Sequence, residues 1–183
     1  MKIFINPGHD VIYDSGAINP NTGMRECDVV ADIGNRLKGY LNDIGIETET
    51  LQSDNLFYDS QYTDRAVPVC VAANESGADI FISLHCNAFN TKARGTETLV
   101  YSWGGESTKL ASAIQNQIIN SIGTVDRGIK VRNDLIVLKK TSMPAVLVET
   151  AFIDNDSDAV LLADKRDEFA RAIARGITDY LSN

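Results

Sequence analysis

A short apolar run that ends in a histidine constrains the fold more than any other stretch of this chain. Residues 79–88 read Asp-Ile-Phe-Ile-Ser-Leu-His-Cys-Asn-Ala, which predicts a buried central strand closed by His85. Strands of this kind belong to parallel sheets with helices on both faces, and such sheets bind ligands at the carboxyl ends of their strands. Taken alone, His85 could equally be a histidine at the rim of a core.

Ionisable residues also follow two other predicted strands. The strand at residues 2–6 is followed by Pro7, Gly8 and His9, and the apolar strand at residues 144–148 is closed by Glu149. The chain has two histidines, and both lie just past the end of a predicted strand. Because such strand ends meet at one edge of a sheet, we expect the three groups to converge there.

The remaining pattern predicts one α/β domain over residues 1–183, with a twisted, mixed and mostly parallel sheet and helices on both faces. A long loop at residues 7–24 leads to a helix that has Glu26 at its start and Gly45 as its stop. Further helices are predicted at residues 64–74 and 157–162, from a cap at Ser107 to Gly123, and from a cap at Asp164 to Leu181. Further strands are predicted at residues 46–51, 96–101 and 134–140.

Composition narrows the function classes. The net charge of −8 argues against nucleic acid as a partner, because phosphate binding needs a cationic surface. No apolar run approaches the ~20 residues of a membrane span, so we expect no membrane insertion. No signal peptide is visible, which predicts export from a longer precursor or release by another route. The three cysteines form no CxxC pair, so a disulfide framework or a cysteine-rich zinc site is not expected.

The residues at the strand ends indicate metal-assisted hydrolysis. Two histidines and one carboxylate are the ligands of a hydrolytic zinc site, which keeps a fourth position open. A second carboxylate then serves as general base and acid. The chain offers His9, His85, Glu26 and Glu149 for these four roles. It contains no His-Glu-x-x-His pair, no Gly-x-Ser-x-Gly elbow and no phosphate-binding P-loop.

Four segments then point to a family. They are Asn6-Pro7-Gly8-His9, Gly23-Met24-Arg25-Glu26, Ile82-Ser83-Leu84-His85-Cys86-Asn87-Ala88, and the stretch from Pro144 through Glu149 to Asn155. Occurring in this order over nearly the whole chain, they resemble the zinc-dependent N-acetylmuramoyl-L-alanine amidases of bacteria and phages. Residues 95–97 and 126–130 are similar to further segments of that family.

The resemblance implies a zinc amidase catalytic domain over residues 1–183. It implies that His9, Glu26 and His85 bind zinc, that Glu149 is the catalytic carboxylate, and that the substrate is peptidoglycan. The bond cleaved would be the amide between the lactyl group of N-acetylmuramic acid and the L-alanine of the stem peptide. Such an enzyme acts on the bacterial cell wall, outside the cytoplasm, as an autolysin or endolysin. We expect a monomer.

Two alternatives remain open at this stage. One is a zinc peptidase or carboxypeptidase that acts on cell-wall peptides. A carboxypeptidase needs an arginine to bind the terminal carboxylate, and nothing in the sequence marks one. The other is a non-catalytic wall-binding domain, in which a fourth protein ligand would close the zinc site.

Other polar and aromatic residues receive structural interpretations. We expect Glu97 to be structural or to support the site, Arg127 to order its loop and Trp103 to pack in a turn. The alternatives are that Arg127 contacts the substrate and that Trp103 stacks on a sugar. Arg65 is given no family role. Some members of the resembled family carry an inserted helix that plugs the zinc site. Here only residues 102–106 separate the predicted strand and helix, so we expect an open site.

Overall fold

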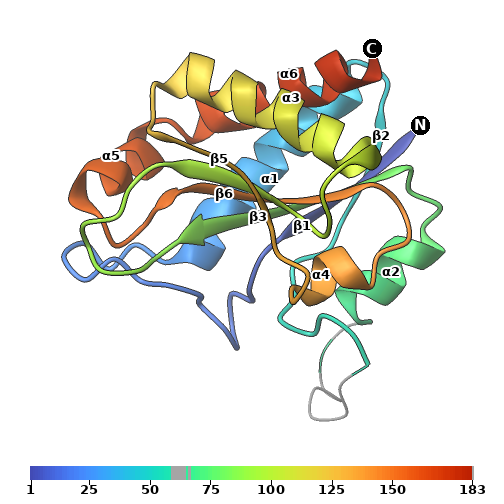
Figure 1. Cartoon of the computed structure of the whole chain (residues 1–183). Helices are drawn as coiled ribbons and strands as arrows, with labels where there is room; N and C mark the ends of the chain where they lie inside the picture. The colour runs from blue at the N-terminus through green and yellow to red at the C-terminus, as the bar shows by residue number, and fades with distance from the viewer. Residues whose placement is uncertain (59–64, 66, 183) are drawn as a thin grey trace.

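The structure, a computed structural model, describes residues 1–58, 65 and 67–182 and contains one mixed sheet (Figure 1). The strands are β1 (Lys2–Pro7), β2 (Glu47–Thr50), β3 (Ile80–Asn87), β4 (Thr96–Val100), β5 (Asp126–Val131) and β6 (Ala145–Phe152). The helices are α1 (Glu26–Asp43), α2 (Val69–Glu75), α3 (Gly105–Ile122), α4 (Ile136–Lys139), α5 (Asp156–Asp164) and α6 (Arg166–Leu181).

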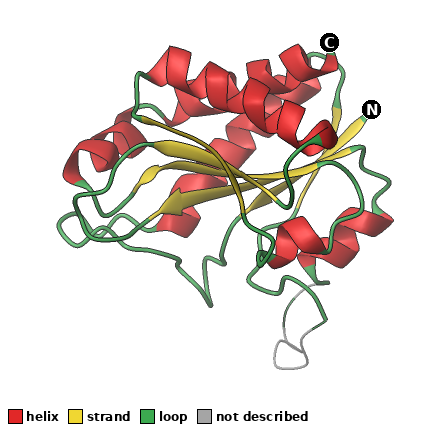
Figure 2. Cartoon of the chain, in the orientation of Figure 1, coloured by secondary structure: helices red, strands yellow, loops and turns green. Residues whose placement is uncertain are grey.

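The sheet has the order β2-β1-β3-β6-β4-β5, and neighbouring strands are parallel except for the antiparallel pair β4–β6. Figures 1 and 2 show α3 and α6 on one side of this sheet and the short helices α2 and α4 on the other. The predicted fold, a mostly parallel mixed sheet covered on both faces, is confirmed. Among the helices that the structure describes, none is long and apolar enough to cross a membrane.

Alternation along the strands divides the core into two clusters, because successive side chains of a strand point to opposite faces. Ile3, Ile5, Ile80 and Ile82 are buried with residues of α1, α3 and α6. Phe4 and Phe81 stack at 5.8 Å between ring centroids and belong to the cluster of α2 and α4.

The layer formed by α2 and α4 is much the shorter of the two. These helices have 7 and 4 residues, whereas α1, α3 and α6 have 18, 18 and 16. On the face that they cover, the apolar residues Phe4 and Phe81 are followed towards the carboxyl ends of β1 and β3 by the polar residues Asn6, Ser83 and His85. The sheet therefore changes from apolar to polar along this face, and the candidate ligand His85 lies at its polar end.

One predicted strand is wrong. Residues 134–140 do not form a strand; Ile136–Lys139 is the helix α4, with Val137 and Leu138 buried against the sheet. The strand at the β4 edge of the sheet is instead β5, at Asp126–Val131, which the sequence did not predict. A short apolar run does not distinguish a strand from a buried helical turn, and β5 is a half-exposed edge strand without an apolar run.

Two predicted helix caps are also wrong. Gly104 precedes α3, and the hydroxyl of Ser107 instead accepts a hydrogen bond from the backbone N–H of Ala145 at 3.1 Å. Asp164 is the last residue of α5, and Lys165 precedes α6. In both cases a polar residue of a type that often caps helices lies near the start of the helix but not at the position that precedes it.

The helix predicted at residues 64–74 begins later than expected. In the structure α2 starts at Val69, directly after Pro68, because the residue before a proline is disfavoured in the helical conformation. The predicted start at Asp64 lies outside the described residues. Between β4 and α3 the chain has only residues 101–104, so this connection carries no inserted helix.

Candidate metal centre and active site

The three predicted ligands converge. His9 lies after β1, Glu26 is the first residue of α1, and His85 lies near the carboxyl end of β3. One potential ligand atom from each lies within 4.8 Å of the other two. Glu26 Oε1 is 3.0 Å from His9 Nε2 and 3.0 Å from His85 Nδ1. Two imidazoles and one carboxylate at this separation have the donor chemistry of a zinc site with an open fourth position.

Two glycines let the loop backbone lie against these ligands. A Cβ atom on Gly8 would lie 2.3 Å from His85 Cε1, which is closer than van der Waals contact allows. A Cβ atom on Gly16, which has φ +64°, would stand 2.6 Å from both Glu26 Oε2 and His9 Cδ2. His9 itself has a positive φ of 65°, an uncommon conformation for a residue other than glycine. The loop is therefore shaped around the ligand side chains.

Glu26 is the best-anchored of the three. It is 3% exposed, and its two oxygens accept backbone hydrogen bonds, Oε1 from Cys86 N–H and Oε2 from Ala17 N–H, each at 2.9 Å. Burial opposes its ionisation, but the contacts with His85 and His9 outweigh burial and hold the pKa of Glu26 below its ordinary value. This carboxylate is therefore ionised and fixed before any metal binds.

A second carboxylate, which sequence reasoning missed, orients His9. Asp14 Oδ2 lies 2.8 Å from His9 Nδ1, and Asp14 Oδ1 accepts a hydrogen bond from Gly16 N–H at 3.0 Å. Burial lowers the pKa of His9, but the contacts with Glu26 and Asp14 outweigh it and raise that pKa to about 9. With Nδ1 directed at Asp14, Nε2 is the ring nitrogen available to a metal. The only signal in the sequence is an acidic residue in the loop after His9.

Glu149 lies beside the ligand group without belonging to it. It pairs with His85 in the parallel β3–β6 register, so the two side chains share one face of the sheet. Glu149 Oε2 is buried and has no hydrogen-bond partner among the residues that the structure describes. Burial raises the pKa of Glu149 from 4.5 to about 7. Glu149 as a whole is half-buried, and a carboxylate with one buried, unpartnered oxygen at the edge of a metal site is suited to take up and release a proton.

A pocket of about 190 Å³ opens in front of the histidines. Its polar lining comes from His9, His85, Asp14 and Asp54. Its apolar lining consists of Leu56, Leu135, Ile136, Val137 and Leu147. Helix α4, in the segment predicted as a strand, thus supplies much of one wall. The site can hold a substrate that presents a polar reacting group to the histidines and an apolar group to α4.

Comparison with known proteins decides the family. The sequence model of the N-acetylmuramoyl-L-alanine amidase family matches residues 3–179. The chain belongs to this family. It is similar to the N-acetylmuramoyl-L-alanine amidase LytC of Bacillus subtilis (strain 168), with 38% identity over 97% of this chain and 35% of LytC. It is also similar to the endolysin of Bacillus phage SPP1, with 36% identity over 95% of this chain and 62% of the endolysin.

Solved structures agree with this assignment. The N-acetylmuramoyl-L-alanine amidase from Clostridium difficile 630 superimposes with a TM-score of 0.86 and 29% identity, covering 100% of this chain and 97% of that one. The family predicted from the sequence is therefore confirmed. The chain spans about a third of LytC and less than two thirds of the phage endolysin, so these relatives contain regions that this amidase-family domain does not match.

Next to Glu149, the amidase-family domain has a cluster of charged residues around Glu97. Glu97 is buried and pairs with Glu149 in the antiparallel β4–β6 register. It accepts hydrogen bonds from Arg127 Nε at 2.7 Å, from Lys130 Nζ and from Asn87 Nδ2 at 3.1 Å. Arg127 was expected to order a loop; it lies on β5 instead and joins that strand to β4.

The two other residues considered from the sequence, Arg65 and Trp103, do not line the pocket. Arg65 pairs with Asp54 at 2.6 Å and lies 3.8 Å above the ring of Tyr13. Trp103 is 67% exposed and follows β4. Because β4 runs antiparallel to β6, its carboxyl end lies at the opposite end of the sheet from Glu149, and Trp103 does not line the pocket.

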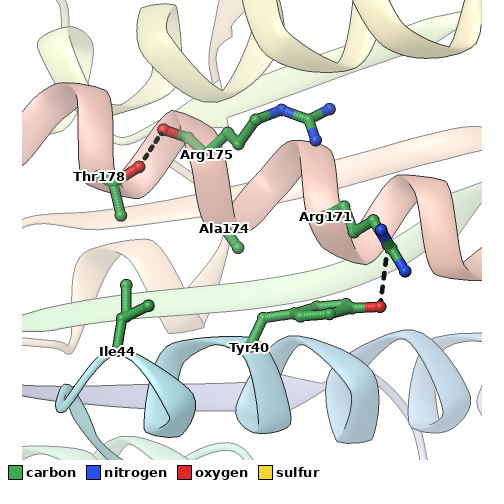
Figure 3. A pocket seen from close by; sticks show the side chains of 6 residues that line it. All are labelled: Tyr40, Ile44, Arg171, Ala174, Arg175 and Thr178. Atoms are coloured by element: carbon green, nitrogen blue, oxygen red, sulfur yellow. Dashed lines mark hydrogen bonds between the residues drawn. The ribbon is translucent and has the colours of Figure 1, made fainter.

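A second hollow, of about 320 Å³, lies between α1 and α6 on the helix side of the domain (Figure 3). Its two arginines already have partners. Arg171 donates to the hydroxyl of Tyr40 at 3.0 Å, and Arg175 donates to the hydroxyl of Ser121 at 2.7 Å. The hollow contains none of the candidate ligands.

Proposed function

We propose that residues 1–183 are the catalytic domain of a zinc-dependent N-acetylmuramoyl-L-alanine amidase. Its substrate is peptidoglycan, and it hydrolyses the amide between the lactyl group of N-acetylmuramic acid and the L-alanine of the stem peptide. The observation that carries this proposal is the approach of His9, Glu26 and His85 within 4.8 Å. The amidase names of the relatives support the choice of bond.

His9 Nε2, a Glu26 oxygen and His85 Nδ1 would hold the zinc ion, and their donor set fits it. Zinc bound there supplies a Lewis acid that polarises the scissile carbonyl and makes a water molecule acidic enough to attack near neutral pH. Backbone hydrogen bonds from Ala17 and Cys86 keep Glu26 in place. The contact of Asp14 with Nδ1 keeps His9 in the tautomer that presents Nε2.

Glu149 carries the proton. Its carboxylate accepts a proton from the attacking water and then delivers it to the nitrogen of L-alanine as that nitrogen leaves. In the metal-free protein burial raises the pKa of Glu149 to about 7, and the charge of a bound zinc ion would act in the opposite direction. The same carboxylate acts first as base and then as acid. The apolar wall of α4 and Leu147 excludes bulk water from this side of the reacting bond, which strengthens the electrostatic interactions in the site.

The deciding experiment is digestion of purified peptidoglycan by the zinc-loaded protein, followed by mass analysis of the products. An amidase releases stem peptides that begin at L-alanine and leaves the glycan strands intact. Cleavage within the stem peptide would identify a peptidase instead. No release at all, with zinc bound, would identify a non-catalytic wall-binding domain. The place of action in this proposal is the bacterial cell wall, and the active species is the monomer.

A further inference from the structure

A row of ionisable side chains crosses the sheet from the candidate metal centre to the sheet edge. His85 on β3 pairs in register with Glu149 on β6, and Glu149 pairs in register with Glu97 on β4. Residues paired directly across neighbouring strands point to the same face. Lys130 on β5 then contacts Glu97. The row therefore starts beside the metal ligands and ends at the edge strand.

The outer end of this row carries a surplus positive charge. Arg127 Nε and Lys130 Nζ both bind the same oxygen of Glu97, Oε2, so two cations share one carboxylate. The side chain of Lys130 is 42% exposed and that of Arg127 is 32% exposed, so both keep donors accessible to a ligand. This surplus is a local exception on a chain whose net charge is −8.

The pocket in front of the histidines, which neither Arg127 nor Lys130 lines, has no such surplus. There the lining includes Asp14 and Asp54, and Asp54 is paired with Arg65. An anionic group on a bound substrate is therefore drawn towards β5 and away from the side of Asp14. This difference in charge favours one direction for an acidic substrate across the sheet.

The spacing fits one position of the stem peptide. Neighbouring strands lie ~4.8 Å apart, so β5 is ~10 Å from β6, and the long side chain of Lys130 reaches back to β4. An extended peptide advances ~3.5 Å per residue, so the second residue from the scissile bond lies ~7 Å away. That residue of a peptidoglycan stem peptide is D-glutamate linked through its γ-carboxyl group, and its α-carboxyl group is either free or amidated.

We propose, on the basis of the amidase function above, that Lys130 together with Arg127 binds the free α-carboxylate of the second stem-peptide residue. The site thereby selects stem peptides that carry this carboxylate over those in which it is amidated. Glu97 holds both cations in place and is held in turn by Asn87. Lys130 is a specificity residue, since its charge acts on binding and takes no part in proton transfer.

The test compares two soluble N-acetylmuramoyl tripeptides that differ only in whether the α-carboxyl group of the second residue is free or amidated. The zinc-loaded protein should show a kcat/KM about three- to tenfold higher for the free acid, which is the range expected of a partly exposed charge-assisted contact. Lys130→Gln should abolish the preference, and Lys130→Arg should retain it. The preference should also shrink as salt is added.

Lys109 provides the matched control, because it is an exposed lysine that pairs with a glutamate on α3, away from the row. Lys109→Gln should leave the preference at the wild-type ratio. Because the readout is a ratio between two substrates, a variant that is partly unfolded or poorly loaded with zinc still reports it. Equal hydrolysis of both tripeptides by the wild type, or an unchanged ratio in Lys130→Gln, would overturn the proposal. Failure to cleave peptidoglycan itself would overturn the amidase function instead.

Discussion

Replacing Glu149 by glutamine should remove most turnover and yet stabilise the metal-free protein. Burial raises the pKa of Glu149 from 4.5 to about 7, and each pKa unit corresponds to ~1.4 kcal/mol. The folded state therefore disfavours the ionised carboxylate by about 3 kcal/mol relative to the unfolded chain. Glutamine has nearly the same shape and no charge to bury.

The sign of this effect depends on pH. A carboxyl group whose pKa is raised by folding contributes its full stability below pH 4.5, where both states are protonated, and loses it as the pH rises through about 7. Wild type and Glu149→Gln should therefore have similar free energies of unfolding near pH 4. Above pH 8 the variant should be more stable by about 3 kcal/mol. Titrating groups distant from Glu149 are common to both proteins, and their effects cancel in the difference, whereas His85, Glu26 and Glu97 interact with the Glu149 charge and contribute to it.

Three measurements on Glu149→Gln separate the possible roles. Urea unfolding of the chelated proteins at pH 4 and pH 8.5 gives the stability difference. Turnover of the zinc-loaded protein should fall by at least ~10²–10⁴-fold, the usual contribution of general acid–base catalysis. Metal analysis should show zinc retained. If zinc is lost, Glu149 is a fourth ligand; if the variant is less stable at pH 8.5, Glu149 has a structural partner. Either result refutes the catalytic assignment.

Three further predictions follow from the ligand group and its surroundings. The protein should bind about one zinc per chain, and chelation should abolish activity that added zinc restores. Glu26→Ala should weaken metal binding and activity together. Full activity after exhaustive chelation would refute the zinc requirement. Asp14→Asn should weaken zinc affinity by ~10–100-fold in a competition titration, because an amide N–H would face His9 Nδ1. Asp10→Asn, in the same loop, is the control, and equal affinities in the two variants would contradict the role of Asp14. Pure protein should digest bare peptidoglycan without an activator, since residues 101–104 carry no helix that could plug the site; a strict requirement for an added partner would exclude this.

The sequence was most informative where burial leaves little choice of structure. The runs that became β1, β3 and β6 are apolar and lie in the centre of the sheet. A histidine or glutamate that closes such a run is conspicuous, and its position at the carboxyl end of a parallel strand places it at the site. For this reason the approach of His9 to His85 could be predicted without coordinates.

The supporting residues could not be predicted because their positions depend on loop shape and strand order. Asp14 reaches His9 only because the loop turns back at Gly16. The contact of Lys130 with Glu97 exists only because β5 lies next to β4. A second pairing, between β4 and β6, sets Glu97 beside Glu149, which is distant from it in sequence. The local pattern of apolar and polar residues along the sequence does not indicate which strands lie next to one another.

The error at residues 134–140 shows how the fold creates the pocket. As a strand, this segment would have extended the sheet; as the helix α4 it packs Val137 and Leu138 against the sheet face instead. Leu135, Ile136 and Val137 then stand opposite the histidines and close one side of the pocket. Because α2 and α4 are short, the polar end of this face is not covered there, and His85 lines the pocket. The minor helical layer thus does two things at once, since it completes the second core and ends early enough to expose the site.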